Sequence, residues 1–178
     1  NFLISYWILI IFTLNQNKHT IQKQQPFYCI LYFFCAELLL CRKCGADVAD
    51  SYYILPKLSP GSKKNEKRNV FGKRNVTIQT LVNPFGVKFE VVTMEKANCE
   101  NVGPAQGADS WFPGYTWRIC ACPHCGQHLG WTFEYSQKGS KDDNLDNHIK
   151  KFHGLIMSNI LGENFTDSLI MMPKMYTM

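Results

Sequence analysis

Two short cysteine motifs carry the clearest chemical signal of the 178-residue chain. Residues 41–45 read CRKCG and residues 122–126 read CPHCG. Two residues between cysteines let one tight turn aim both sulfurs at a single ion, and the glycine that follows relaxes the backbone around it. Four thiolates suit tetrahedral Zn²⁺ and leave no open coordination position, which favours a structural role over a catalytic one. The predicted ligands of one structural Zn²⁺ are Cys41, Cys44, Cys122 and Cys125.

Four further cysteines lie outside these motifs. Cys29 and Cys35 fall in the apolar N-terminal part of the chain, and Cys99 and Cys120 fall in the second half. In an oxidising compartment Cys99 and Cys120 can form a disulfide, and two buried free thiols are the alternative. A redox function for the two C-x-x-C motifs would need a βαβ context, which the sequence does not show.

Three tryptophans surround the second cysteine motif. Trp111, Trp117 and Trp131 lie within 21 residues, and a Pro-Gly pair at positions 113–114 turns the chain between the first two. The cysteine motif joins the segment of Trp117 to that of Trp131, so three indoles can converge into a cage. Such a cage binds a small flat ring through its faces, or a cation through the ring quadrupoles. Simple packing in the core is the alternative reading.

The segments that must position these residues have the pattern of an all-β domain. Residues 75–82 alternate apolar and polar side chains, and residues 87–93 are rich in β-branched ones. The intervening NPFG at 83–86 is a turn, because proline fixes φ and glycine accepts a positive φ, so we expect a hairpin. The remaining predicted elements are strands at 117–120 and 129–135, a short helix within 146–158 and a last strand at 168–172.

Composition and charge narrow the class of protein. Hydrophobic residues make up 46% and the net charge is +5, which indicates one globular domain and excludes a strongly acidic tail protein. Residues 57–75 carry seven basic residues against one acidic residue. Proline and glycine interrupt this run and it lacks interleaved aromatics, so we predict a solvated basic loop. Nucleic-acid binding is the alternative.

The N-terminal part differs from the rest. We predict that residues 1–40 are a signal-like or mispredicted apolar segment and that residues 41–178 form the domain. The apolar stretches 2–14 and 27–41 are each too short to span a bilayer. We therefore expect a secreted, extracellular protein, or a cytoplasmic one if the segment is a gene-model artefact. Two N-glycosylation acceptors agree with secretion: Asn75-Val76-Thr77 and Asn164-Phe165-Thr166.

The motifs taken together resemble a known family. SWFPGYTW at 110–117, CPHCGQHLGW at 122–131, the NPFG turn, CRKCG, and the closing HGLI and DSLIMMPK are similar to the CULT domain, the thalidomide-binding domain family of cereblon. The resemblance covers about residues 41–174. It implies two antiparallel β-sheets pinned by zinc, a fold called a β-tent.

The resemblance also implies a function. CULT domains hold glutarimide, dihydrouracil and related cyclic imides in a cage of three tryptophans, without catalysis. The expected partner is a small molecule or a peptide that ends in a cyclic imide; no nucleic acid, stable membrane span or ubiquitin ligase adaptor is expected. The family commonly has histidine where Asp109 stands. The predicted ligand-binding residues are Asn83, Pro84, Phe85, Asp109, Ser110, Trp111, Trp117, Trp131 and Phe133.

Two other functions remain open at this point. A methionine sulfoxide reductase B-like enzyme shares a related zinc-pinned fold and would need Cys120 or Cys99 as a reactive thiol. Its arginine-x-cysteine-x-asparagine pattern is matched only at the first three positions, from Arg118 to Cys120. A nucleic-acid-binding zinc ribbon would use the basic residues of 57–74, and strong salt dependence would be its mark.

Overall fold

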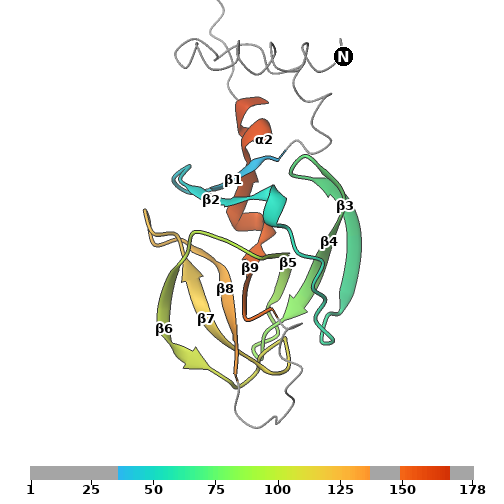
Figure 1. Ribbon diagram of the computed structural model, residues 1–178, viewed down its shortest axis with the longest axis vertical. Coiled ribbons are helices and arrows are strands. Elements are labelled where there is room, and N and C mark those ends of the chain that lie inside the picture. Colours follow the sequence, from blue (N-terminus) through green and yellow to red (C-terminus); the bar gives the residue numbers. More distant parts are fainter. Residues whose placement is uncertain (1–35, 137–148, 169–178) are drawn as a thin grey trace, which may run out of the picture. The chain divides into compact units, whose positions relative to one another are not determined.

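The computed structural model describes residues 36–136 and 149–168. Within them the chain forms two antiparallel β-sheets, which confirms the predicted fold class (Figure 1). The smaller sheet has the order β10-β1-β2. Its strands are β1 (Leu38–Cys41), β2 (Asp47–Asp50) and β10 (Ile160–Gly162).

The larger sheet has seven strands in the order β3-β4-β5-β9-β8-β7-β6. Strand β9, from the C-terminal part of the domain, lies between β5 and β8 and pairs antiparallel with both. The sheet is therefore complete only when segments far apart in sequence have paired. Its strands are β3 (Lys64–Val70), β4 (Lys73–Val82), β5 (Lys88–Met94), β6 (Glu100–Gln106), β7 (Tyr115–Ala121), β8 (His128–Tyr135) and β9 (Lys151–Ile156).

Three short helical turns complete the described elements. Two are 3₁₀ turns, η2 (Ser51–Tyr53) and η4 (Met157–Asn159), and one is the helix α2 (Glu163–Ser168). None of the helices in 36–136 and 149–168 is long and apolar enough to cross a lipid bilayer.

Two groups of buried side chains hold the sheets. One group joins the small sheet to the large one, with Leu39 and Val48 packed against Met94, Leu129 and Leu155. The other lies within the large sheet and is mainly aromatic. In it the rings of Phe133 and Phe152 stack 5.0 Å apart, and Phe112 meets both edge-on. Burial of these side chains removes apolar surface from water, which is the main favourable term in folding.

The predicted hairpin is confirmed, since β4 pairs antiparallel with β5 across the NPFG turn. The predicted strands at 117–120 and 129–135 lie within β7 and β8.

The predicted basic loop at 57–75 is wrong. Most of it is the hairpin of β3 and β4. Lys64, Glu66 and Arg68 alternate along β3, and Arg68 donates to Glu66 and Glu90. Because residues two apart share one face of a strand, opposite charges pair there and make an extended conformation favourable.

Three further boundaries differ from expectation. The predicted helix within 146–158 is wrong, because residues 151–156 form β9; residues 146–148 lie outside the described part. Ser168 ends helix α2 and begins no strand, and residues 169–172 are again outside the description. At the start, β1 extends back to Leu38, and Leu39 is fully buried. The domain therefore includes residues that the predicted 40/41 boundary assigned to the leading segment.

Candidate functional site

The four predicted metal ligands lie together. The sulfurs of Cys41, Cys44, Cys122 and Cys125 are all within 4.8 Å of one another. Cys41 and Cys44 belong to the turn between β1 and β2, and the other two belong to the turn between β7 and β8. The site thus joins the small sheet to the large one. Four converging thiols form an arrangement that could hold a metal ion.

The two cysteine turns have the same internal hydrogen bonds. Gly45 N donates to Cys41 O at 2.8 Å, and Gly126 N donates to Cys122 O at 2.9 Å. Both glycines have a positive φ, +73° and +70°, which explains why each motif ends in glycine. In the first turn Arg42 N also donates to Asn159 O at 3.0 Å, so that turn is attached to η4 as well.

The surroundings of the sulfurs change their acidity in different directions. A hydrogen bond from the backbone of Gln127 lowers the pKa of the Cys125 thiol to about 7. Burial raises the pKa of the Cys41 thiol. A thiolate is the form that binds metal, so Cys125 is the ligand most readily supplied in that form at neutral pH.

The three predicted cage tryptophans line one pocket of about 250 Å³. Eight of the nine predicted ligand-binding residues are in its wall, and Ser110 is not. The Ser110 hydroxyl donates to Phe112 O instead. The lining residues are Asn83, Pro84, Phe85, Asp109, Trp111, Trp117, Trp131 and Phe133.

Three tryptophans approach the pocket from two elements and the loop before β7. Trp131 lies on β8, is 9% exposed, and meets the ring of Trp111 edge-on at 4.6 Å. The indole of Trp111 donates to Val82 O at 2.8 Å, and that of Trp117 donates to Ala108 O at 2.8 Å. Each of these two indole N–H groups is therefore satisfied by the protein, which leaves the ring faces for a ligand.

The rim of the pocket is formed by two turns. In the NPFG turn, the side chain of Asn83 accepts from the backbone N–H groups of Phe85 and Val87. This fixes the turn while the Phe85 ring is 91% exposed. On the opposite turn Asp109 is exposed and has a positive φ of 55°. The floor is Phe133, which is 1% exposed.

Sequence reasoning missed two residues that support the cage. Phe89 on β5 packs edge-on against Trp131 at 5.0 Å and lies 6.1 Å from Trp111. His128 meets Trp131 edge-on at 4.8 Å, and burial lowers its pKa. Because residues two apart share one face of a strand, Phe89 lies on the same face of β5 as Val91, but nothing in the local sequence shows that this face meets a tryptophan.

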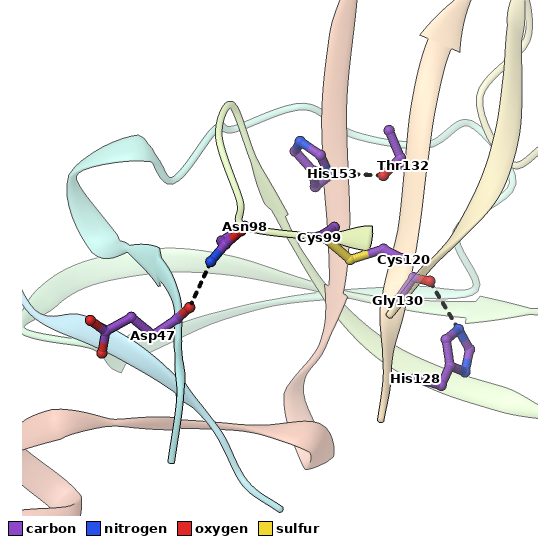
Figure 2. The surroundings of a disulfide bond; sticks show 8 residues. All are labelled: Asp47, Asn98, Cys99, Cys120, His128, Gly130, Thr132 and His153. Carbon is purple, nitrogen blue, oxygen red and sulfur yellow. Dashed lines mark hydrogen bonds between the residues drawn. A yellow bond between two sulfur atoms is a disulfide. The ribbon is translucent and has the colours of Figure 1, made fainter. Parts of the chain in front are cut away.

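The question of Cys99 and Cys120 is answered in favour of a disulfide (Figure 2). Their Cα atoms are 5.1 Å apart. Cys120 lies on β7 and is fully buried, and Cys99 directly precedes β6. The bond ties the edge strand β6 to its neighbour. His153 lies close by and its ring faces the hydroxyl of Thr132 at 3.1 Å.

Comparison with known proteins agrees with the geometry. The chain is 41% identical to cereblon of Gallus gallus over 81 residues, which is 45% of this chain and 17% of that protein. It is 41% identical to cereblon of Xenopus tropicalis over 78 residues, 43% of this chain and 16% of that protein. Cereblon of Drosophila pseudoobscura pseudoobscura is 35% identical over 96 residues, 52% of this chain and 14% of that protein.

The matched region spans less than a fifth of the length of these relatives. No protein-family model matches the chain. Over about half of its length the chain is similar to cereblon, which confirms the predicted resemblance to a cereblon-like CULT domain.

Proposed function

We propose that this domain is a zinc-stabilised, non-catalytic binding module that takes a small cyclic imide, or a peptide ending in one, into its aromatic pocket. The observation that carries the proposal is the convergence of Trp111, Trp117 and Trp131 on one pocket of about 250 Å³. This volume is below the usual range for drug-sized ligands and fits a single ring.

The chemistry of an imide suits this pocket. Its ring presents two apolar faces to the indoles, and its N–H and two C=O groups need partners once they leave water. We expect backbone groups of the segment 109–111, in which Asp109 and Trp111 line the pocket, to supply such partners. Enclosure by aromatic faces with about three hydrogen bonds corresponds to micromolar affinity, on the order of 8 kcal/mol.

Zinc is the metal we propose for the four-cysteine site. A tetrahedron with sulfurs about 2.3 Å from its centre has edges of roughly 3.8 Å. The sulfur of Cys41 lies 3.7 Å from that of Cys125, and that of Cys44 lies 3.7 Å from that of Cys122. The residues present therefore fit a four-thiolate zinc ion, whose role would be to join the two sheets.

The two alternative functions have less support. In the reductase hypothesis Cys120 must reach a substrate, but its sulfur bonds Cys99 and the residue is fully buried. In the nucleic-acid hypothesis the basic segment must present free charge, but Arg68 pairs with Glu66 and Glu90. Both observations favour a binding module.

A titration of the zinc-loaded protein with glutarimide, followed by tryptophan fluorescence, tests the proposal. We expect saturable quenching at micromolar concentration that Trp117→Ala abolishes while the zinc content stays near one. Tyr52→Ala is the control, because it also removes an aromatic ring, which is 62% exposed and lies outside the pocket. A folded, zinc-loaded wild-type protein that gives no response would refute imide binding.

We also propose that the protein is secreted. Support comes from the Cys99–Cys120 disulfide, because disulfides persist in oxidising compartments, and from the exposed glycosylation acceptors Asn75 and Asn164. When the full chain is expressed in animal cells, we expect glycosidase treatment of secreted protein to increase its gel mobility. Asn75→Gln should remove part of that shift, and Asn69→Gln, an exposed asparagine outside the motif, should not. Unglycosylated protein retained in the cell would contradict secretion.

A further inference from the structure

Two buried polar side chains lie behind the pocket wall and have no part in the function proposed so far. Gln79 on β4 is fully buried, and Ser59, in the connection between η2 and β3, is 4% exposed. Buried polar groups are costly unless they are hydrogen-bonded, so their partners show what they hold. Here both ends of the Gln79 amide are used. Its Oε1 accepts from Ser59 N at 2.7 Å, and its Nε2 donates to Lys57 O at 2.8 Å.

The hydroxyl of Ser59 extends this network to the pocket. Gly61 N donates to Ser59 Oγ at 3.1 Å, and Ser59 Oγ donates to the backbone carbonyl of Trp111 at 2.5 Å. The hydroxyl thus accepts one hydrogen bond, from Gly61, and donates its proton in the other, to Trp111. Residues 59 and 111 are 52 positions apart, so this contact is not a product of local folding.

Trp111 is thus attached to β4 at two points. Its carbonyl is bound through Ser59 to Gln79, and its indole N–H donates directly to Val82 O. The turn that carries it, between β6 and β7, is otherwise exposed at Gly107 and Ala108, and Asp109 there has a positive φ. The next residue, Phe112, is buried against Phe133 and Phe152 and fixes the far end of the turn. The segment before Trp111 is exposed, so the two hydrogen bonds to β4, together with contact to the Trp131 ring, hold the Trp111 ring in its orientation.

We propose that Gln79 and Ser59 are positioning residues for ligand binding, which hold Trp111 in the orientation that completes the aromatic pocket. Neither touches the pocket, and both act through the carbonyl of Trp111. Without them the turn would sample other positions, and apparent affinity would fall by the fraction of molecules in which the pocket is formed. The effect on affinity rests on the proposed imide-binding function, but the effect on Trp111 does not.

The test uses the full-length, zinc-loaded protein and its Ser59→Ala variant. Ser62→Ala is the matched control, since this serine lies in the same connection and bonds Lys64 O and Asn65 instead. Two quantities are measured: the affinity for glutarimide, and the hydrogen-exchange rate of the Trp111 indole N–H in protein labelled with ¹⁵N at tryptophan. We expect Ser59→Ala to weaken binding about tenfold, the size of one lost buried hydrogen bond, and to speed exchange at Trp111.

Backbone amide exchange in β8 shows whether the fold is intact and should not change in Ser59→Ala. Gln79→Leu should also weaken binding and speed exchange at Trp111. If Gln79→Leu does not fold, Ser59→Ala alone tests the positioning role. If the wild type does not bind glutarimide but Ser59→Ala still speeds exchange at Trp111, the imide proposal fails and the positioning role stands. Unchanged exchange at Trp111 and, where the wild type binds, unchanged affinity would overturn the positioning role.

Discussion

Replacement of Gly130 by alanine is expected to be among the most damaging single changes in this domain. Gly130 lies on β8 directly before Trp131 and pairs with Leu155 of β9. A Cβ at this position would lie 1.9 Å from the carbonyl oxygen of Gly154 and 3.0 Å from Leu155 Cα. Both are backbone atoms of the adjacent strand, so no side-chain rotation relieves the clash.

The size of the effect follows from these distances. Non-bonded carbon and oxygen atoms need well over 3 Å, so β9 would have to move by roughly 1 Å or more. That strand is held on both sides, by β5 and by β8, and close-packed interiors do not yield at this scale. The φ of Gly130, +152°, is also one that other residues rarely adopt. We expect a loss of at least about 4 kcal/mol, a large part of the 5–15 kcal/mol typical of a domain.

Urea unfolding at fixed zinc concentration, followed by tryptophan fluorescence and circular dichroism, measures this loss. Two glycine-to-alanine variants separate its causes. Gly86→Ala adds a Cβ to open space at a φ of +81°, and should cost only about 1 kcal/mol. Gly154→Ala meets the side chains of Val91 and Phe133 at 3.0 and 3.3 Å, which can adjust, and should cost an intermediate amount. A Gly130→Ala protein as stable as Gly86→Ala would refute the reasoning.

Three other predictions concern the metal site, pH and the disulfide. Cys122→Ser should remove zinc and unfold the domain, because metal binding supplies folding energy. Mass spectrometry would measure the zinc content and circular dichroism the secondary structure. A folded, metal-free variant would contradict this prediction. Burial lowers the pKa of His153 to about 4, so the unfolded chain takes up a proton first as the pH falls below about 6.5. Stability should therefore drop by about 1 kcal/mol between pH 7.5 and 5.5, and a His153→Gln variant with the same slope in urea unfolding would exclude this cause. Replacing both Cys99 and Cys120 by alanine should lower the free energy of unfolding by about 3 kcal/mol, the value for a loop closed between residues 21 positions apart, and should leave the zinc content unchanged. Equal urea midpoints for the variant and the wild type would show that the disulfide does not stabilise the domain.

Local chemistry made the four-cysteine cluster and the turns predictable from sequence. The C-x-x-C-G pattern specifies its own turn, and both glycines have the positive φ that the pattern indicates. The NPFG turn likewise fixes itself through the side chain of Asn83. The positions of Trp117 and Trp131 followed from their strands. Where the residues of a turn or strand determine its geometry, pattern and structure agree.

The errors lie where distant segments decide the structure. Residues 151–156 occupy a central place in the large sheet and are buried at every position after Lys151. A strand buried on both faces has no alternation, so its sequence cannot be told from a short helix. In the basic segment Glu66 pairs with Lys64 and Arg68 of the same strand, and Arg68 also pairs with Glu90 of β5; the net charge along the sequence does not reveal these pairs. The Ser59 contact to Trp111 depends on a sequence separation of 52 residues, and no local pattern reveals it.

The separation of the two cysteine turns has a consequence for how the protein is made. The paired sulfurs are 78 and 84 positions apart, so the second turn leaves the ribosome roughly 4–16 s after the first at usual rates of synthesis. Between them lie β2 to β7 and the pocket turns with Asn83 and Trp111. A nascent chain that ends before Cys125 can therefore offer at most three of the four sulfurs. If the site takes up zinc as proposed, capture of the metal by all four sulfurs marks a chain on which every wall of the pocket up to Trp117 has already been synthesised.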